Sequence, residues 1–257
     1  MSFEYISLEQ AVSASGPRMV VPQGIPSPWS EAVKGFFHLR GISWQALYLD
    51  QRNDAMKQWT GKRSAPVLMV DNQPPVHRWQ DILAFAHTQG EGAELLPQDP
   101  QQKQQVMALC GSLMDENGLA WNRRLVCIEK GLKQQPGGYP EFIANYLGKK
   151  YGYDDSHSGD YVSRVCTQLQ QLTQQLEQQN QAGSRFLVGD QLSAADIYCA
   201  CVMAFFKPLT HEQCAMSPVI REVFESLSEA EQQALDPILI QHRDFIYQQY
   251  LELPLSL

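Results

Sequence analysis

The residues best placed to do chemistry stand at the start of a predicted helix near the N-terminus. Ser27 precedes Pro28 and Trp29, and Pro28 suits the first position of a helix that runs to about Arg40. A serine hydroxyl here can cap the helix by accepting a backbone N–H. Together with the positive end of the helix it can also favour a thiolate over a thiol, which lowers the pKa of a bound sulfur. The two roles are compatible, and the sequence leaves both open.

Other candidate residues indicate structure rather than chemistry. Ser193 and Asp196 have the Ser-x-x-acid spacing of a capping box, and the helix that follows is apolar on nearly every side, so we interpret Asp196 as a cap. The six cysteines include no Cys-x-x-Cys pair, and His211-x-x-Cys214 is the closest histidine pairing. We therefore expect no metal site and interpret the cysteines as small core residues.

Length and charge narrow the class of protein. The chain has 257 residues, enough for two modest domains, and a net charge of -8, which argues against a nucleic-acid binder. The N-terminal residues lack the pattern of a signal peptide, and no apolar run approaches the roughly 20 residues of a membrane span. These features predict a soluble, cytoplasmic protein that does not act on membranes.

The order of predicted elements divides the chain in two. Residues 17–89 predict strand, helix, strand, helix, a hairpin and a final helix, which is the order of a thioredoxin-like domain. Residues 90–100 are rich in turn formers and are expected to link the domains. Residues 101–257 predict helices throughout, the first starting at Asp99-Pro100 and extending toward Trp121. The expected fold is thus an α/β thioredoxin-like domain over residues 1–89 followed by an all-α domain.

With these elements in place, residues 17–253 resemble the glutathione S-transferase superfamily. Gly61–Leu68 is similar to the family segment that ends in Val-Pro-x-Leu, and Ile25–Ser30 looks like the N-terminal motif of the tau and omega branches. The capped helix within Phe186–Met203 is similar to the central helix of the family's second domain. The resemblance implies a two-domain glutathione-transferase-like fold.

The resemblance also implies a glutathione site. In the family the motif proline is cis, and the residue before it pairs its backbone with the cysteinyl part of glutathione; here these are Pro66 and Ala65. Ser27 would contact the glutathione sulfur as the catalytic residue. Since it is serine rather than cysteine, conjugation is favoured over thiol-disulfide exchange.

One position departs from the family pattern. An acid or glutamine followed by serine usually holds the γ-glutamyl ammonium and carboxylate, and Arg78 and Trp79 occupy the matching place here. Arg78 can pair with a carboxylate but repels an ammonium. A shift of the alignment would make Asp81 the acid instead. We therefore expect an atypical glutathione site that includes Arg78 and Trp79.

A polar cluster in the second domain is the expected substrate pocket. In this family the helix after the linker faces the cleft between domains, so Arg123 or Arg124 would meet an anionic substrate and Trp121 would supply an apolar wall. The alternative is a solvated face with an interdomain salt bridge.

These features give two functional hypotheses. The first is a homodimeric enzyme that conjugates glutathione, as its substrate, to an electrophile. The second is a non-catalytic protein of the same fold that binds a protein partner or a small thiol or carboxylate ligand.

Overall fold

The computed structural model describes residues 3–257 and begins with a four-stranded sheet in the order β1-β3-β2-β4. Strands β1, β3 and β2 are parallel, and β4 is antiparallel to β2. The strands are β1 (Phe3–Tyr5), β2 (Pro17–Val21), β3 (Trp44–Tyr48) and β4 (Val67–Val70). The predicted hairpin after β4 is reduced to one bridge between Leu68 and Val76. Strand β1, which the sequence did not predict, adds an edge to the sheet.

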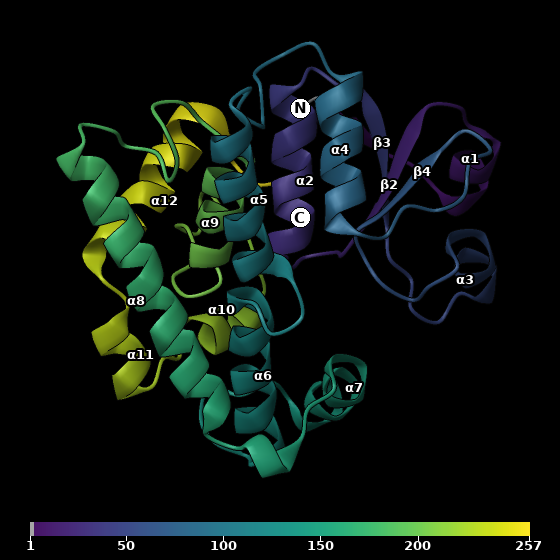
Figure 1. The fold of residues 1–257 in the computed structure, drawn as a ribbon. Helices are drawn as coiled ribbons and strands as arrows, with labels where there is room; N and C mark the ends of the chain where they lie inside the picture. The colour runs from purple at the N-terminus through teal and green to yellow at the C-terminus, as the bar shows by residue number, and fades with distance from the viewer. Residues whose placement is uncertain (1–2) are drawn as a thin grey trace.

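Both faces of the sheet are covered by helices. Helices α2 and α4 lie between the sheet and the rest of the molecule, while α1 and α3 lie on the other side (Figure 1). The alternation of β2 explains this arrangement, since Met19 and Val21 pack into the main core and Val20 into the second core. These helices are α1 (Leu8–Ser13), α2 (Pro28–Leu39), α3 (Asp54–Thr60) and α4 (Trp79–Gln89). This small mixed α/β unit is thioredoxin-like, as predicted.

The remainder of the chain is helical, as the sequence predicted. This part contains helices α5 to α12. The ten residues of α9 are all buried, and α9 packs against α2, α5 and α12. The capping box predicted for Ser193 and Asp196 is present at the start of α9. The helices are α5 (Pro100–Met114), α6 (Leu119–Leu132), α7 (Glu141–Tyr151), α8 (Asp160–Gln181), α9 (Ala194–Met203), α10 (Pro218–Glu225), α11 (Glu229–Ala234) and α12 (Pro237–Tyr250). In residues 3–257 no helix combines the length and the apolar character that crossing a bilayer requires.

The predicted long helix from Pro100 past Trp121 is broken into two. Helix α5 ends at Met114 and α6 starts at Leu119. Asn117 has a φ of 67°, which an α-helix cannot accommodate, and asparagine tolerates this left-handed conformation better than most residues. In Figure 1 helix α6 lies below α5 in nearly the same direction, and α7 lies beside the lower part of α6.

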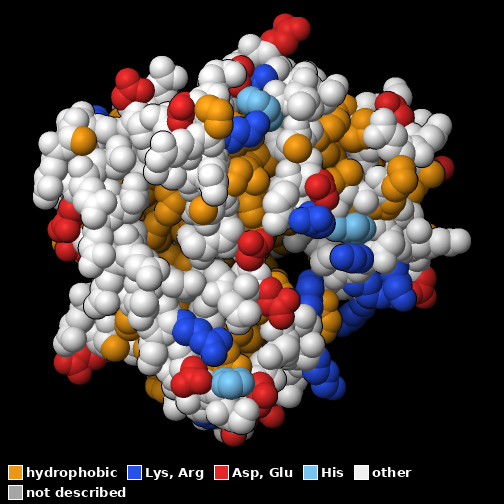
Figure 2. Space-filling model, in the orientation of Figure 1, with side chains coloured by type: hydrophobic (Ala, Val, Ile, Leu, Met, Phe, Trp, Pro, Cys, Tyr) orange, Lys and Arg blue, Asp and Glu red, His pale blue; other side chains and the backbone are white. Residues whose placement is uncertain are grey.

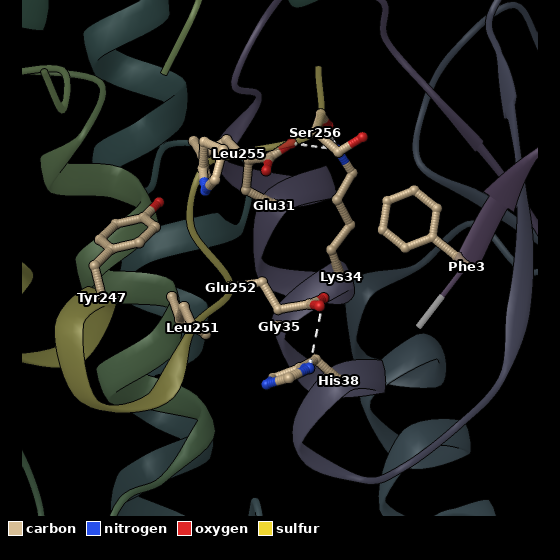
Figure 3. Close-up of a pocket in the computed structure, with 11 residues that line it drawn as sticks. Phe3, Glu31, Lys34, Gly35, His38, Tyr247, Leu251, Glu252, Leu255 and Ser256 are labelled. Carbon is tan, nitrogen blue, oxygen red and sulfur yellow. Dashed lines mark hydrogen bonds and ion pairs between the residues drawn. The ribbon is translucent and has the colours of Figure 1, made fainter. Parts of the chain in front are cut away.

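The segment after α12 returns to the first domain. Lys34 of α2 donates a hydrogen bond to the carbonyl of Ser256 at 2.6 Å, and Figure 3 shows its side chain pointing at this segment. The hydroxyls of Tyr5 and Tyr48 donate to the carbonyls of Ser256 and Leu257 at 3.2 and 3.0 Å. The C-terminal segment therefore ties the sheet to the helical domain.

Candidate functional site

A cavity of about 370 Å³ lies between the first domain and helices α6 and α7. Lys and Arg side chains gather on the side of the molecule where α3 and α7 face one another (Figure 2). The first domain lines the cavity with residues that follow β2 or β3 and with one that precedes β4: Pro22, Ile25, Ser27, Leu49, Gln51, Arg52 and Ala65. The hollow in Figure 3, beside α2 and the C-terminal segment, measures only about 30 Å³ and holds no more than a water or two. The cavity of about 370 Å³ is the candidate site because Ser27 and Ala65 line it.

The hydroxyl of Ser27 is available to a ligand in this cavity. Ser27 occupies the N-cap position of α2, yet its side chain makes no capping hydrogen bond. Its backbone is fully used, because its N–H donates to Ile25 and its carbonyl accepts from Glu31. Of the two roles open to Ser27, the side-chain cap is absent here, and the hydroxyl lies at the positive end of a twelve-residue helix.

Ala65 presents its backbone to the same cavity. The Ala65–Pro66 peptide bond is cis, which confirms that prediction. Ala65 lines the cavity just before β4, whereas Pro66 is outside the lining. Within residues 3–257 the N–H and carbonyl of Ala65 have no hydrogen-bond partner. An extended peptide-like ligand could bond to them as an added strand.

Arg124 is the buried cation of the cavity. Its side chain lies among aromatic rings, with Cζ at 5.2 Å from the Trp29 ring centroid, 5.0 Å from Tyr151 and 5.3 Å from Phe205. Only 8% of the residue is exposed. Trp29 follows Ser27 by two residues, so the start of α2 brings the hydroxyl to the cavity and one ring to the guanidinium. The predicted substrate-pocket residue Arg124 thus lies in the cavity.

Its two predicted neighbours lie elsewhere. Arg123 points away from the cavity and forms a fully buried ion pair with Glu231 at 2.9 Å. Trp121 packs edge-on against Tyr151 at 4.7 Å between centroids and does not line the cavity. Trp121 therefore supports the wall of the cavity from behind.

Lys150 of α7 is a second cation of the cavity, which the sequence analysis did not single out. Its ammonium lies near the rings of Tyr146 and Tyr151, at 6.0 and 5.8 Å from their centroids. Although the residue as a whole is exposed, partial burial of its ammonium, and after it the charge of Arg124, lowers the pKa of Lys150 to about 8. The signal that could have located this wall is the apolar face of α7, where Phe142 and Tyr146 recur with helical spacing beside Lys150.

Arg78 and Trp79 lie outside this cavity. Trp79 begins α4 in the core between the domains, where its indole N–H donates to Asp115 at 2.6 Å. Arg78 is the N-cap residue of α4 and is 70% exposed at its side chain, with Asp81 at 3.9 Å. The structure therefore brings Ser27, Ala65 and Arg124 together and leaves Arg78, Trp79 and Trp121 apart from them.

The charge of the cavity is one-sided. Arg52, Arg124 and Lys150 line it, and the lining includes no aspartate or glutamate of the described residues. Among residues 3–257 no group of three or more metal-ligating side chains is arranged to hold a metal ion. The site therefore suits an anionic, partly apolar ligand that bonds to a backbone edge and to a hydroxyl.

Comparisons with known proteins agree with the fold. Residues 148–229 match the family "Glutathione S-transferase, C-terminal domain". No curated protein matches the chain at a significant level.

Solved structures share the fold at low identity. A glutathione S-transferase from Methylobacillus flagellatus with glutathione bound has a TM-score of 0.63 at 16% identity, over 91% of this chain and 96% of that one. A maleylacetoacetate isomerase from Methylobacterium extorquens, with malonate and glutathione bound, has a TM-score of 0.53 at 18% identity, over 91% and 99%. A β-etherase from Sphingobium has a TM-score of 0.57 at 14% identity, over 89% and 99%. These similarities show that both halves of the chain have the fold of these proteins.

Proposed function

We propose that the chain is a member of the glutathione S-transferase superfamily and that it transfers glutathione to an electrophilic small molecule in the cavity between its two domains. The observation that carries the proposal is the Ser27 hydroxyl, which is unused as a cap and lines the same cavity as Ala65. Structural neighbours that contain glutathione support it.

Ser27 would act on the sulfur of glutathione. Its O–H donates to the thiolate, and the positive end of α2 adds to the same stabilisation, so the thiol loses its proton to solvent more readily. With chlorodinitrobenzene, the thiolate then forms a carbon–sulfur bond at the ring carbon that bears chlorine, and chloride leaves. Ala65 would hold the cysteinyl backbone by its N–H and carbonyl while Pro66 fixes the turn into β4.

The charges of the cavity predict weak glutathione binding. Glutathione carries two carboxylates and one ammonium, and the cavity offers three cations but no acid for the ammonium. Arg78 and Trp79, expected at the γ-glutamyl end, remain candidates for that role only if the ligand extends beyond the cavity. We expect a dissociation constant in the millimolar range, about 4 kcal/mol weaker than micromolar binding.

The same missing acid favours the second hypothesis, a non-catalytic protein that binds a small carboxylate ligand or a protein partner through the cavity. The two hypotheses predict different effects of Ser27, since only transfer chemistry needs its hydroxyl.

Calorimetry with glutathione and turnover of chlorodinitrobenzene test the proposal together. We expect Ser27→Ala to lower kcat/KM on the order of 10- to 100-fold, comparable to removal of a hydrogen bond to a charged group. Ser30→Ala is the matched control, because Ser30 lies on the same helix, is buried, and does not line the cavity. Equal activity in the Ser27→Ala and unaltered proteins, or no glutathione binding at all, would favour the non-catalytic hypothesis.

We also propose a homodimer, in which the first domain of one subunit pairs with the second domain of the other. Such an interface is isologous. Sedimentation should give about twice the subunit mass of 29.1 kDa, and a species of 29.1 kDa at micromolar concentration would contradict this assembly.

A further inference from the structure

The guanidinium of Arg124 is buried without a counter-ion. Within residues 3–257 it has no carboxylate in ion-pair range, and its Nε and one of its terminal nitrogens are buried without a hydrogen-bond partner. Arginine stays charged at all accessible pH values. A buried charge that lacks both an ion pair and hydrogen bonds costs several kcal/mol, and such groups are uncommon outside functional sites.

The rings around Arg124 compensate only part of this cost. Trp29, Tyr151 and Phe205 attract the cation by their π faces, each by about 0.5–2 kcal/mol. None of these rings accepts the in-plane N–H bonds of the guanidinium. Nε and one terminal nitrogen are closed off from the cavity, so a carboxylate there would bond to the other terminal nitrogen and neutralise the charge of the guanidinium.

Lys150 supplies a second positive charge to the same space. Its charge interacts with that of Arg124, so the two cations repel one another. One anion between them would relieve the repulsion and give Arg124 a counter-ion.

The rest of the lining calls for an apolar body on that anion. Helix α7 presents Phe142 and Tyr146 with 77% and 40% of their surfaces exposed, and Ile143 and Leu147 line the cavity beside them. Exposed aromatic side chains that line a cavity are typical of ligand sites. A flat aromatic ring system would cover them.

We propose that Arg124 and Lys150 bind the carboxylate of the second substrate, and that this substrate is an aromatic carboxylate. The proposal rests on the proposed function for its catalytic meaning, since it names the class of acceptor. Its binding test is independent of glutathione. Because glutathione also carries carboxylates, the experiment must separate the two sources of the anion.

Calorimetry of the full chain with 2-naphthoate, in the absence of glutathione, measures the anion site. The uncharged 2-naphthamide reports the apolar lining alone. We expect Arg124→Met to weaken 2-naphthoate on the order of 10- to 100-fold and to leave 2-naphthamide unchanged. Unchanged 2-naphthamide binding also shows that the variant has folded. Lys149→Met is the matched charge control for Lys150→Met, because Lys149 is exposed and does not line the cavity.

S-methylglutathione, which cannot react at sulfur, identifies the source of the carboxylate. We expect Arg124→Met to leave its affinity within about twofold, and 2-naphthoate to bind in its presence. Competition between the two, with equal loss for both in the Arg124→Met variant, would assign Arg124 to glutathione and overturn the proposal. Equal affinity for 2-naphthoate and 2-naphthamide, or no 2-naphthoate binding, would overturn it too. Arg124-dependent 2-naphthoate binding without any S-methylglutathione binding would leave the anion site standing and remove the transferase function.

Discussion

Two consecutive arginines on α6 meet opposite surroundings. Arg123 is fully buried and donates to Glu231 at 2.9 Å and to the carbonyl of Phe224 at 2.9 Å, so its charge is neutralised within the helical domain. Arg124 is nearly as buried but has aromatic rings in place of an acid, and it lines a cavity. Adjacent helix positions differ by about 100° around the axis, which is enough to send one side chain inward and the other to the cleft.

The contrast distinguishes a structural cation from one that awaits a ligand. Both residues cost desolvation energy, and only Arg123 recovers it from the protein itself. A buried charge is thus assigned to structure or to function by its partners rather than by its burial.

The largest expected effect follows from breaking the structural pair. Arg123→Met removes the cation and leaves Glu231 buried with an unpaired charge, so we expect the free energy of unfolding to fall by about 3–5 kcal/mol. Urea denaturation followed by circular dichroism measures this loss. A change below about 1 kcal/mol would contradict the prediction that this pair stabilises the fold.

A second substitution should recover part of that loss. Glu231→Gln removes the orphaned charge and keeps an oxygen that accepts from the N–H of Ser228, as the capping box requires. We expect the double variant with Arg123→Met to regain about 1–3 kcal/mol relative to Arg123→Met alone. Strictly additive losses in the urea experiment would show that the two side chains are not energetically coupled.

The sequence predicts local structure better than it predicts which of two neighbours meets the cavity. The helix start at Ser27–Pro28 and the capping box at Ser193 depend on residues within one turn, and both are found as predicted. The partner of Arg123 is Glu231, 108 residues later in the chain, so nothing in the local sequence separates Arg123 from Arg124.

The other features that the sequence analysis missed also depend on contacts between residues distant in the chain. Strand β1 pairs with β3, and Tyr5 bonds to Ser256 of the C-terminal segment, so both short segments are positioned by residues far away in the chain. Helix α7 contributes much of the cavity wall, and it packs against α6, whose separate start at Leu119 the sequence did not predict. The family alignment placed Trp79 at the glutathione site. In the structure its indole N–H donates to Asp115 of the other domain.

Removing Arg124 should stabilise the protein, whereas removing Arg123 should destabilise it. Arg124→Met exchanges an unpaired buried charge for a flexible apolar side chain that can pack among Trp29, Tyr151 and Phe205. We expect the free energy of unfolding to rise by about 1 kcal/mol in the absence of ligand. A loss as large as that of Arg123→Met in the same urea experiment would show that the rings alone stabilise the cation, and the comparison between the two arginines would fail.

The smallest effect concerns the pH dependence of anion binding. The pKa of Lys150 is about 8, below the ordinary value of lysine because its ammonium is desolvated and faces Arg124. The other groups around it are Tyr146 and Tyr151 on its own helix and Arg63, whose carbonyl accepts from the lysine at 3.4 Å. Arginine stays charged, and burial raises the pKa of Tyr146, so Lys150 is the group that loses charge as pH rises through 8.

A lowered lysine pKa means that the charged form is present below about pH 8 and is lost above it. A carboxylate of ordinary pKa stays ionised throughout this range. The affinity for 2-naphthoate should therefore fall by up to about tenfold between pH 7 and pH 9 as the lysine becomes neutral. Calorimetry at both values measures this change, and Lys150→Met should bind weakly and equally at the two, while Lys149→Met should keep the full dependence. An undiminished pH dependence in Lys150→Met would place the titrating group elsewhere and leave Arg124 as the sole cation that the carboxylate contacts.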